Sequence, residues 1–108
     1  MEKTNNDFQI QAEKAQSLFY EDECTGYRIY WARYDKKTHS LIQDGFLKKQ
    51  YKSLRDAVCA LRMLSKSGPL VERVWKIIGY DDNKYLCVYN EEKRILEDIY
   101  LYETGVVL

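Results

Sequence analysis

Three cysteines and a single histidine are the residues best suited to chemistry in this 108-residue chain. Cys24, Cys59, Cys87 and His39 together would supply three thiolates and one imidazole to a zinc ion. Structural zinc sites usually take their ligands in close pairs, because a pair fixes two coordination directions at once. Here neighbouring candidates lie at least 15 residues apart, so we expect neither a metal nor another cofactor.

Cys59 is the one cysteine whose neighbours suggest reactivity. In a helix, Arg55 and Arg62 would lie on either side of it, and nearby cations favour the reactive thiolate. His39 could serve as its base. However, His39 falls in a polar segment where no neighbour would orient its ring, and cysteines within helices are common without a function. We therefore do not expect a cysteine enzyme.

Paired carboxylates, the other common acid and base groups, are no better placed. Asp81-Asp82, Glu91-Glu92 and Glu97-Asp98 are sequence neighbours in turns or at an ambiguous element, where solvation explains them. The chain also lacks a Gly-rich phosphate loop, a Gly-x-Ser-x-Gly elbow and a His-Glu-x-x-His pair. We expect a protein without catalytic activity.

Aromatic residues are interleaved with cations through the middle of the chain: Tyr30, Trp31, Tyr34, Tyr51 and Trp75. In single-strand binders such rings stack on bases, each contributing ~1–3 kcal/mol, while Lys and Arg hold the backbone. With only three Phe beside ten Tyr and two Trp, however, the core has to use many of these rings. No RNP-type aromatic motif, Gly-x-x-Gly clamp or Cys/His finger is present, so we assign most of the rings to packing.

A helix over residues 53–67 is the clearest element that would position these groups. Ser53 can cap its start, Asp56 suits the positive end of the helix dipole, and Gly68-Pro69 can end it. Apolar residues at helical spacing form a stripe that would face a core: Leu54, Ala57, Val58, Leu61 and Leu64. The opposite face would carry a largely basic row: Arg55, Cys59, Arg62 and Lys66.

Two predicted hairpins flank this helix. Segments 27–34 and 40–47 have strand composition and are joined by a polar loop, and segments 70–80 and 85–89 are joined by an Asp-Asp-Asn turn. In this ββαββ order, a single amphipathic helix gains most by lying across one face of an antiparallel sheet. We therefore predict an α+β fold with four or five antiparallel strands.

The two ends of the chain extend this core. Apolar residues at helical spacing predict a helix over residues 7–23 that ends before Gly26. Residues 91–103 fit either a helix capped by Asn90 or a fifth strand, and their composition slightly favours the strand.

The length predicts one domain. Within it we expect a helical extension over residues 1–26, a core over 27–90, and a strand or helix over 91–108.

The formal net charge is zero, but the charges are separated along the chain. Residues 1–27 carry −4, residues 28–76 carry +8 and residues 77–108 carry −4. The candidate acidic face consists of carboxylates from the two end segments: Glu21, Asp22, Glu23, Asp81, Asp82, Glu91 and Glu92. The candidate basic face consists of cations from the middle: Arg33, Lys48, Lys49, Lys52, Arg55, Arg62 and Lys66.

Two interpretations of this separation remain open. The acidic ends can pack beside the basic middle and neutralise it, each exposed pair contributing ~0–1 kcal/mol and implying no partner. Alternatively, the two faces are opposed and each meets a partner of the other charge.

We expect a small non-catalytic protein-binding module of the inhibitor, immunity or adaptor type, in which acidic clusters steer association and exposed Tyr residues anchor it. Small phage and mobile-element proteins are often of this size and type. The alternative is direct nucleic-acid binding through residues 28–76. A homodimer, in which the basic middle meets an acidic end, is a third arrangement.

The sequence also indicates a compartment. The chain starts without a secretory signal, and nowhere do ~18 apolar residues run together. Three isolated cysteines fit thiols in a reducing compartment better than a disulfide framework. We expect a cytoplasmic protein that does not bind membranes.

Overall fold

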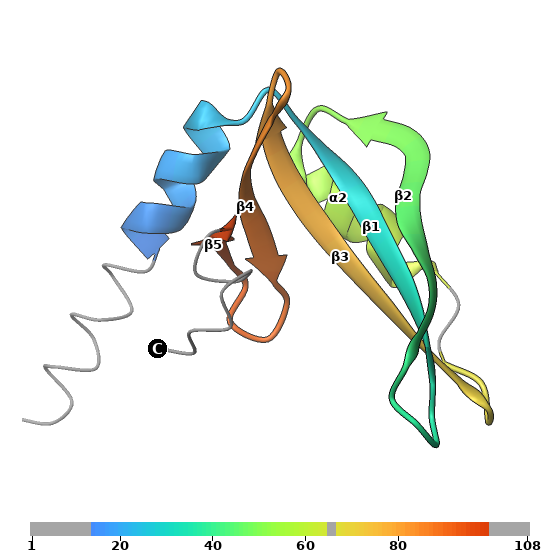
Figure 1. Cartoon of the computed structure of the whole chain (residues 1–108). Helices are drawn as coiled ribbons and strands as arrows, with labels where there is room; N and C mark the ends of the chain where they lie inside the picture. The colour runs from blue at the N-terminus through green and yellow to red at the C-terminus, as the bar shows by residue number, and fades with distance from the viewer. Residues whose placement is uncertain (1–13, 65–66, 100–108) are drawn as a thin grey trace, which may run out of the picture. The chain divides into compact units, whose positions relative to one another are not determined.

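A computed structural model describes residues 14–64 and 67–99 of the chain (Figure 1). The elements follow the order β1 (Gly26–Asp35), β2 (Leu41–Tyr51), α2 (Leu54–Arg62), β3 (Val71–Asp81), β4 (Lys84–Asn90) and β5 (Ile95–Asp98). Residues 14–23 form a further helix before β1. The five described strands form one antiparallel sheet in the order β2-β1-β3-β4-β5. The predicted α+β fold is therefore confirmed.

By its internal contacts the chain divides into two compact units. One is Gly26–Ile78, and the other combines Met1–Thr25 with Gly79–Leu108. The division falls within β3, so the sheet contributes strands to both units. The expectation of a single domain stays a prediction.

The first hairpin forms where the sequence predicts it. Its loop begins at Asp35, whose carboxylate Oδ1 accepts hydrogen bonds from the backbone N–H groups of Lys37 (2.8 Å) and Thr38 (3.1 Å), closing an Asx turn. β2 continues to Tyr51 instead of ending at residue 47. Three of the extra residues, Lys48 to Gln50, are polar and exposed, so their composition hides the end of a strand that pairs with the start of β1.

Helix α2 starts at the predicted cap and ends earlier than predicted. The Ser53 hydroxyl accepts a hydrogen bond from the Asp56 N–H at 3.2 Å. The helix ends at Arg62, and bonds from Met63 N–H to Ala60 and from the next residue to Leu61 tighten its last turn. The predicted end at residue 67 is therefore wrong.

Ser67 belongs to the approach to β3 instead of to the helix. Its hydroxyl accepts a hydrogen bond from the Arg73 N–H at 2.9 Å, and the Gly68 N–H donates to the Val71 carbonyl at 3.1 Å. These bonds stabilise a turn into the strand, which local helix signals do not reveal. Lys66, expected on the helix, lies outside the described residues.

The core of the Gly26–Ile78 unit comes from both faces of its strands and one side of α2. Its buried residues are Tyr27, Ile29, Ala32, Ala57, Val58, Ile77 and Ile78. Helix α2 contacts β1 and β2, and it lies behind these strands in Figure 1. Two members of the predicted apolar stripe, Ala57 and Val58, are buried as expected.

In the second unit, the helical residues 14–23 are tied to β5. The Ser17 hydroxyl accepts a hydrogen bond from the Leu96 N–H at 2.6 Å, and the Tyr20 hydroxyl donates to Asp98 Oδ2 at 2.8 Å. The buried side chains of this unit are Cys87, Val88, Ile95 and Leu96.

The structure chooses between the two alternatives for the C-terminal segment and confirms the described part of the N-terminal helix. Residues 95–98 are the predicted fifth strand, and Asn90 caps the turn before it through a 3.1 Å bond from the Lys93 N–H. Residues 100–103, and residues 7–13 of the predicted N-terminal helix, lie outside the described part. None of the helices in the described ranges has the length and apolar character needed to span a membrane.

Replacing Ile29 by alanine tests the core of the Gly26–Ile78 unit. Ile29 is fully buried, so Ile29→Ala should lower the free energy of unfolding by about 2–5 kcal/mol in denaturant titrations. Leu41→Ala is the matched control, because Leu41 is 50% exposed on β2, and it should change stability by less than about 0.5 kcal/mol. Equal effects of the two substitutions would contradict this core.

Candidate nucleic-acid interface

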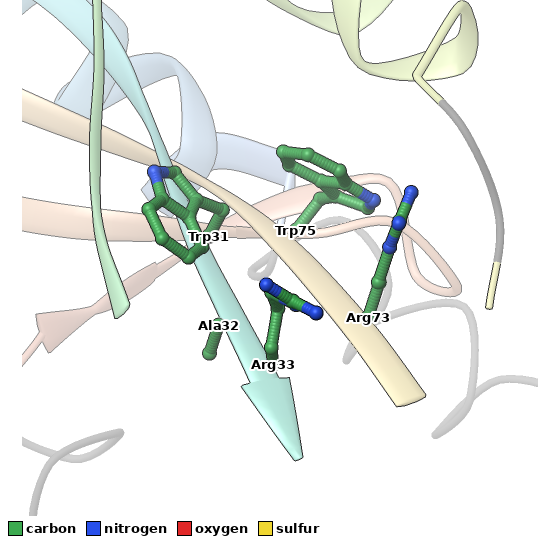
Figure 2. Close-up of a pocket in the computed structure, with 5 residues that line it drawn as sticks. All are labelled: Trp31, Ala32, Arg33, Arg73 and Trp75. Carbon is green, nitrogen blue, oxygen red and sulfur yellow. The ribbon is translucent and has the colours of Figure 1, made fainter. Parts of the chain in front are cut away.

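A pocket of about 170 Å³ lies on the Gly26–Ile78 unit and is lined by side chains of β1 and β3. We call it the Trp–Arg pocket, and its lining residues are Trp31, Ala32, Arg33, Arg73 and Trp75. Figure 2 shows both indoles and both guanidinium groups extending from the two neighbouring strands. In this view the Arg33 guanidinium lies between Trp31 and Arg73.

Strand geometry explains why these residue types meet. Alternate residues of a strand share one face, so Ile29, Trp31 and Arg33 follow one another along β1. On β3 the order along the chain is reversed, from Arg73 through Trp75 to Ile77. β1 and β3 are antiparallel neighbours, so both strands progress from a buried isoleucine to a tryptophan and then to an arginine.

The Trp31 ring lies against β2 where that strand has no side chain. Gly45 is the register partner of Trp31, and a Cβ placed on this glycine would lie 3.4 Å from Cζ2 of the indole. The indole therefore lies close to the Gly45 backbone, at a distance where an added Cβ would make van der Waals contact with the ring. This contact holds one wall of the pocket in place.

Arg33, which lines the pocket, contains a buried hydrogen-bond donor. In the part of the chain that the structure describes, the Nε atoms of Arg28 and Arg33 are buried without a hydrogen-bond partner. The Arg28 guanidinium lies over the Phe46 ring, 4.6 Å from its centre, and so has an aromatic contact. A buried donor without an acceptor costs free energy, and of these two arginines Arg33 is the one that lines the Trp–Arg pocket.

Of the five aromatic residues considered as base-stacking candidates, two line the pocket. Trp31 and Trp75 are brought together, whereas the Tyr30 ring packs edge-on against Phe46 at 5.6 Å. The Tyr51 ring lies under the Lys49 ammonium at 5.2 Å. The remaining candidate, Tyr34, is half-buried on β1 and does not line the pocket.

The predicted basic residues are spread over the same unit. Exposed cations lie on β2, on the connection after it and on α2: Lys48, Lys49, Lys52, Arg55 and Arg62. Only Arg33 of the predicted set lines the pocket, and Arg73 was missed as a site residue. Its signal is the spacing Trp-x-Arg over residues 31–33, mirrored by Arg-x-Trp over residues 73–75.

The predicted acidic residues divide into two groups within their own unit. Thr25 joins the end of the 14–23 helix to the β3–β4 turn: its N–H donates to the Tyr80 carbonyl at 2.8 Å, and its hydroxyl accepts from the Asp82 N–H at 3.2 Å. This brings residues 21–23 to the same end as residues 81–82. Residues 91–92 lie in the turn at the opposite end of β4.

The thiols and the histidine are distributed differently from a metal site. Cys24 and Cys87 have their sulfur atoms 3.6 Å apart. Cys59 is exposed on α2, and His39 is exposed in the β1–β2 loop with a φ of 58°. Within residues 14–64 and 67–99, no three His, Cys, Asp or Glu side chains come together as metal ligands.

Comparisons with protein-family models, with curated proteins and with solved structures find no match to this chain. A functional assignment therefore has to be argued from its own side chains.

Ionisation of the Tyr30 hydroxyl should make the stability of the protein depend on pH in the alkaline range. The hydroxyl donates a 2.7 Å hydrogen bond to Asp44 Oδ2, and this bond, with burial and the carboxylate charge, raises the pKa of Tyr30 to about 12. The unfolded phenol ionises near pH 10. The contribution of this bond is therefore complete below about pH 10 and is lost as the pH rises towards 12.

Ultraviolet titration of tyrosinate from pH 9 to beyond pH 12, combined with unfolding measurements from pH 9 to 11.5, tests this assignment. Asp44→Asn should move one tyrosine towards pH 10, and Tyr30→Phe should remove the transition near pH 12 and flatten this part of the stability profile. A titration unchanged in both variants would show that another tyrosine is responsible.

Proposed function

We propose that this protein is a non-catalytic binder of single-stranded nucleic acid that uses the Trp–Arg pocket. The observation that carries the proposal is that two indoles and two guanidinium groups line one pocket. Bases of any sequence stack on indole faces, and guanidinium groups form paired hydrogen bonds with phosphate oxygens. A nucleotide presents both groups together.

The size of the pocket favours one unit of a polymer over a complete small molecule. At about 170 Å³, it is smaller than the ~300–1,000 Å³ sites that enclose drug-sized ligands. It suits one base or one phosphate of a strand that continues across the surface. Bases in a duplex are already stacked on each other, so only an unpaired base is available to the indoles.

The charge of the surrounding segment supports binding to a polyanion. Residues 28–76 carry +8, and exposed cations lie on β2 and on α2 beside the strands that hold the pocket. Such charges attract phosphates without reading sequence. We therefore propose a binder with little sequence preference.

Binding of labelled oligo(dT) and oligo(U) at ~50 mM and ~200 mM salt tests this function. Trp31→Ala and Trp75→Ala should each weaken binding about 5- to 150-fold, because one stacked base contributes ~1–3 kcal/mol. The double variant Arg33→Ala/Arg73→Ala should reduce the salt dependence of the affinity. A duplex of the same length should bind more weakly.

The other unit supplies matched controls. Tyr85→Ala removes an aromatic residue that is 40% exposed on β4, and Lys84→Ala removes an exposed cation beside it. Both should leave oligonucleotide binding within about twofold of the unchanged protein. Absence of binding at ~50 mM salt, or equal losses in the control and pocket variants, would refute the proposal.

A second candidate function, protein binding of the inhibitor, immunity or adaptor type, is favoured by a surface on the other unit. The Thr25 bonds place residues 21–23 at the same end of that unit as residues 81–82, so their carboxylates gather there. Leu18 and Phe19, on the same helix, are 61% and 58% exposed. Apolar side chains beside charged ones are typical of a protein interface, and these carboxylates would steer a basic partner.

Recovery of tagged protein from its native cell tests the second function. A stoichiometric protein partner should be retained, and Glu21→Lys/Asp82→Lys should slow its association. The matched control is Glu91→Lys/Glu92→Lys, which reverses two charges at the opposite end of β4 and should have a smaller effect. A monomer without any partner would exclude this function, and sedimentation would reveal a homodimer.

A further inference from the structure

Two cysteines that are far apart in the sequence meet in the unit that contains β4 and β5. Cys24 lies between the 14–23 helix and β1, and Cys87 lies in β4. Their Sγ atoms are 3.6 Å apart in a thiol–thiol hydrogen bond, across 63 residues of sequence. Neither the nucleic-acid proposal nor the protein-binding proposal uses this contact.

We propose that Cys24 and Cys87 form a reversible disulfide site that is closed by low-molecular-weight disulfides such as oxidised glutathione. A disulfide requires sulfurs about 2.05 Å apart, so the two atoms have to approach by roughly 1.5 Å from their present separation of 3.6 Å. Rotation of the Cys24 side chain, which lies outside any regular element, can supply this movement. β4 and its hydrogen bonds can then stay in place.

Burial assigns the order in which the two thiols react. Cys24 is half-buried and can be reached from solvent, whereas Cys87 is fully buried. The hydrogen bond with Cys24, followed by burial, raises the pKa of Cys87, so this thiol stays protonated while Cys24 is reduced. Cys24 is therefore the entering thiol, and Cys87 is the resolving thiol.

The reaction balances in two exchange steps. The Cys24 thiolate attacks one sulfur of oxidised glutathione, forming a mixed disulfide and releasing the first glutathione thiolate, which takes up a proton. The Cys87 sulfur then attacks the Cys24 sulfur, displacing the second glutathione, and the Cys87 proton passes to this leaving thiolate. The two protein thiols together lose two electrons and two protons, which two molecules of reduced glutathione carry away.

Closure of this site would stabilise one unit without altering the other. The bond would connect the segment after the 14–23 helix to β4 and would restrict a long loop of the unfolded chain. The Trp–Arg pocket belongs to the Gly26–Ile78 unit. Oxidation should therefore change thermal stability while leaving oligonucleotide affinity within about twofold, so failure of either proposal is recognised separately.

The experiment equilibrates the full-length reduced protein with mixtures of oxidised and reduced glutathione, traps the remaining thiols by alkylation, and maps peptides by mass spectrometry. The expected product is a peptide linked through Cys24 and Cys87. Cys59, exposed on α2, should carry only a glutathione adduct. The linked form should unfold at a Tm higher by roughly 5–15 °C, and excess dithiol reductant should reverse the change.

Single substitutions separate the roles of the two thiols. Cys87→Ala should trap the mixed disulfide between Cys24 and glutathione, whereas Cys24→Ser should leave Cys87 unmodified. Cys59→Ser keeps both members of the pair and should give the same linked peptide as the unchanged protein. Because Cys87 is buried, Cys87→Val is a second resolving-thiol variant if the alanine variant does not fold.

The unchanged protein by itself can overturn the proposal. A glutathione adduct on Cys24 beside an intact Cys87 thiol would show that the second exchange does not occur. Two unmodified thiols at every glutathione ratio would show that the contact is a packing contact alone.

Discussion

The antiparallel pairing of β1 with β3 is the constraint on which the candidate site depends. Backbone bonds from the Thr25 N–H to the Tyr80 carbonyl and from the Lys36 N–H to the Leu70 carbonyl lie just beyond the two ends of this pair. Between these two bonds, β1 and β3 run side by side in opposite directions. The pairing turns two separate tripeptide patterns into a single surface with two tryptophans and two arginines.

Polarity changes gradually along that surface, and the change explains how a packing core and a candidate site share the same strands. Ile29 and Ile77 are fully buried, the tryptophans next to them are half-buried, and the arginines follow. The indoles thus have one part against the protein and another part available to a ligand. Both tryptophans stand on strands, and the Trp31 ring lies against Gly45, so under the proposed function little order would have to be gained on binding.

The unit containing β4 and β5 is held together by polar contacts across long stretches of sequence. Hydroxyl groups of Ser17, Tyr20 and Thr25 each bond to groups at least 55 residues further along the chain. The thiol pair adds a fourth contact of this kind. Serine, tyrosine, threonine and cysteine side chains make these contacts, and nothing in the local sequence around them indicates their distant partners.

The sequence by itself determined the local elements: the Ser53 cap of α2, both hairpins and the ββαββ order, whereas for residues 91–103 it favoured a strand over a helix only slightly. Caps, turns and hydrophobic periods act over a few residues and can be identified without the fold. The sequence also identified Trp31 and Trp75 as candidates for base stacking and Arg33 as a candidate for the basic face, although it gave no reason to group the three. Only the tertiary structure decided that Arg73 joins them and that Cys24 meets Cys87. Strand order and long-range contacts depend on which distant segments pair, and that choice is made by burial over the whole chain.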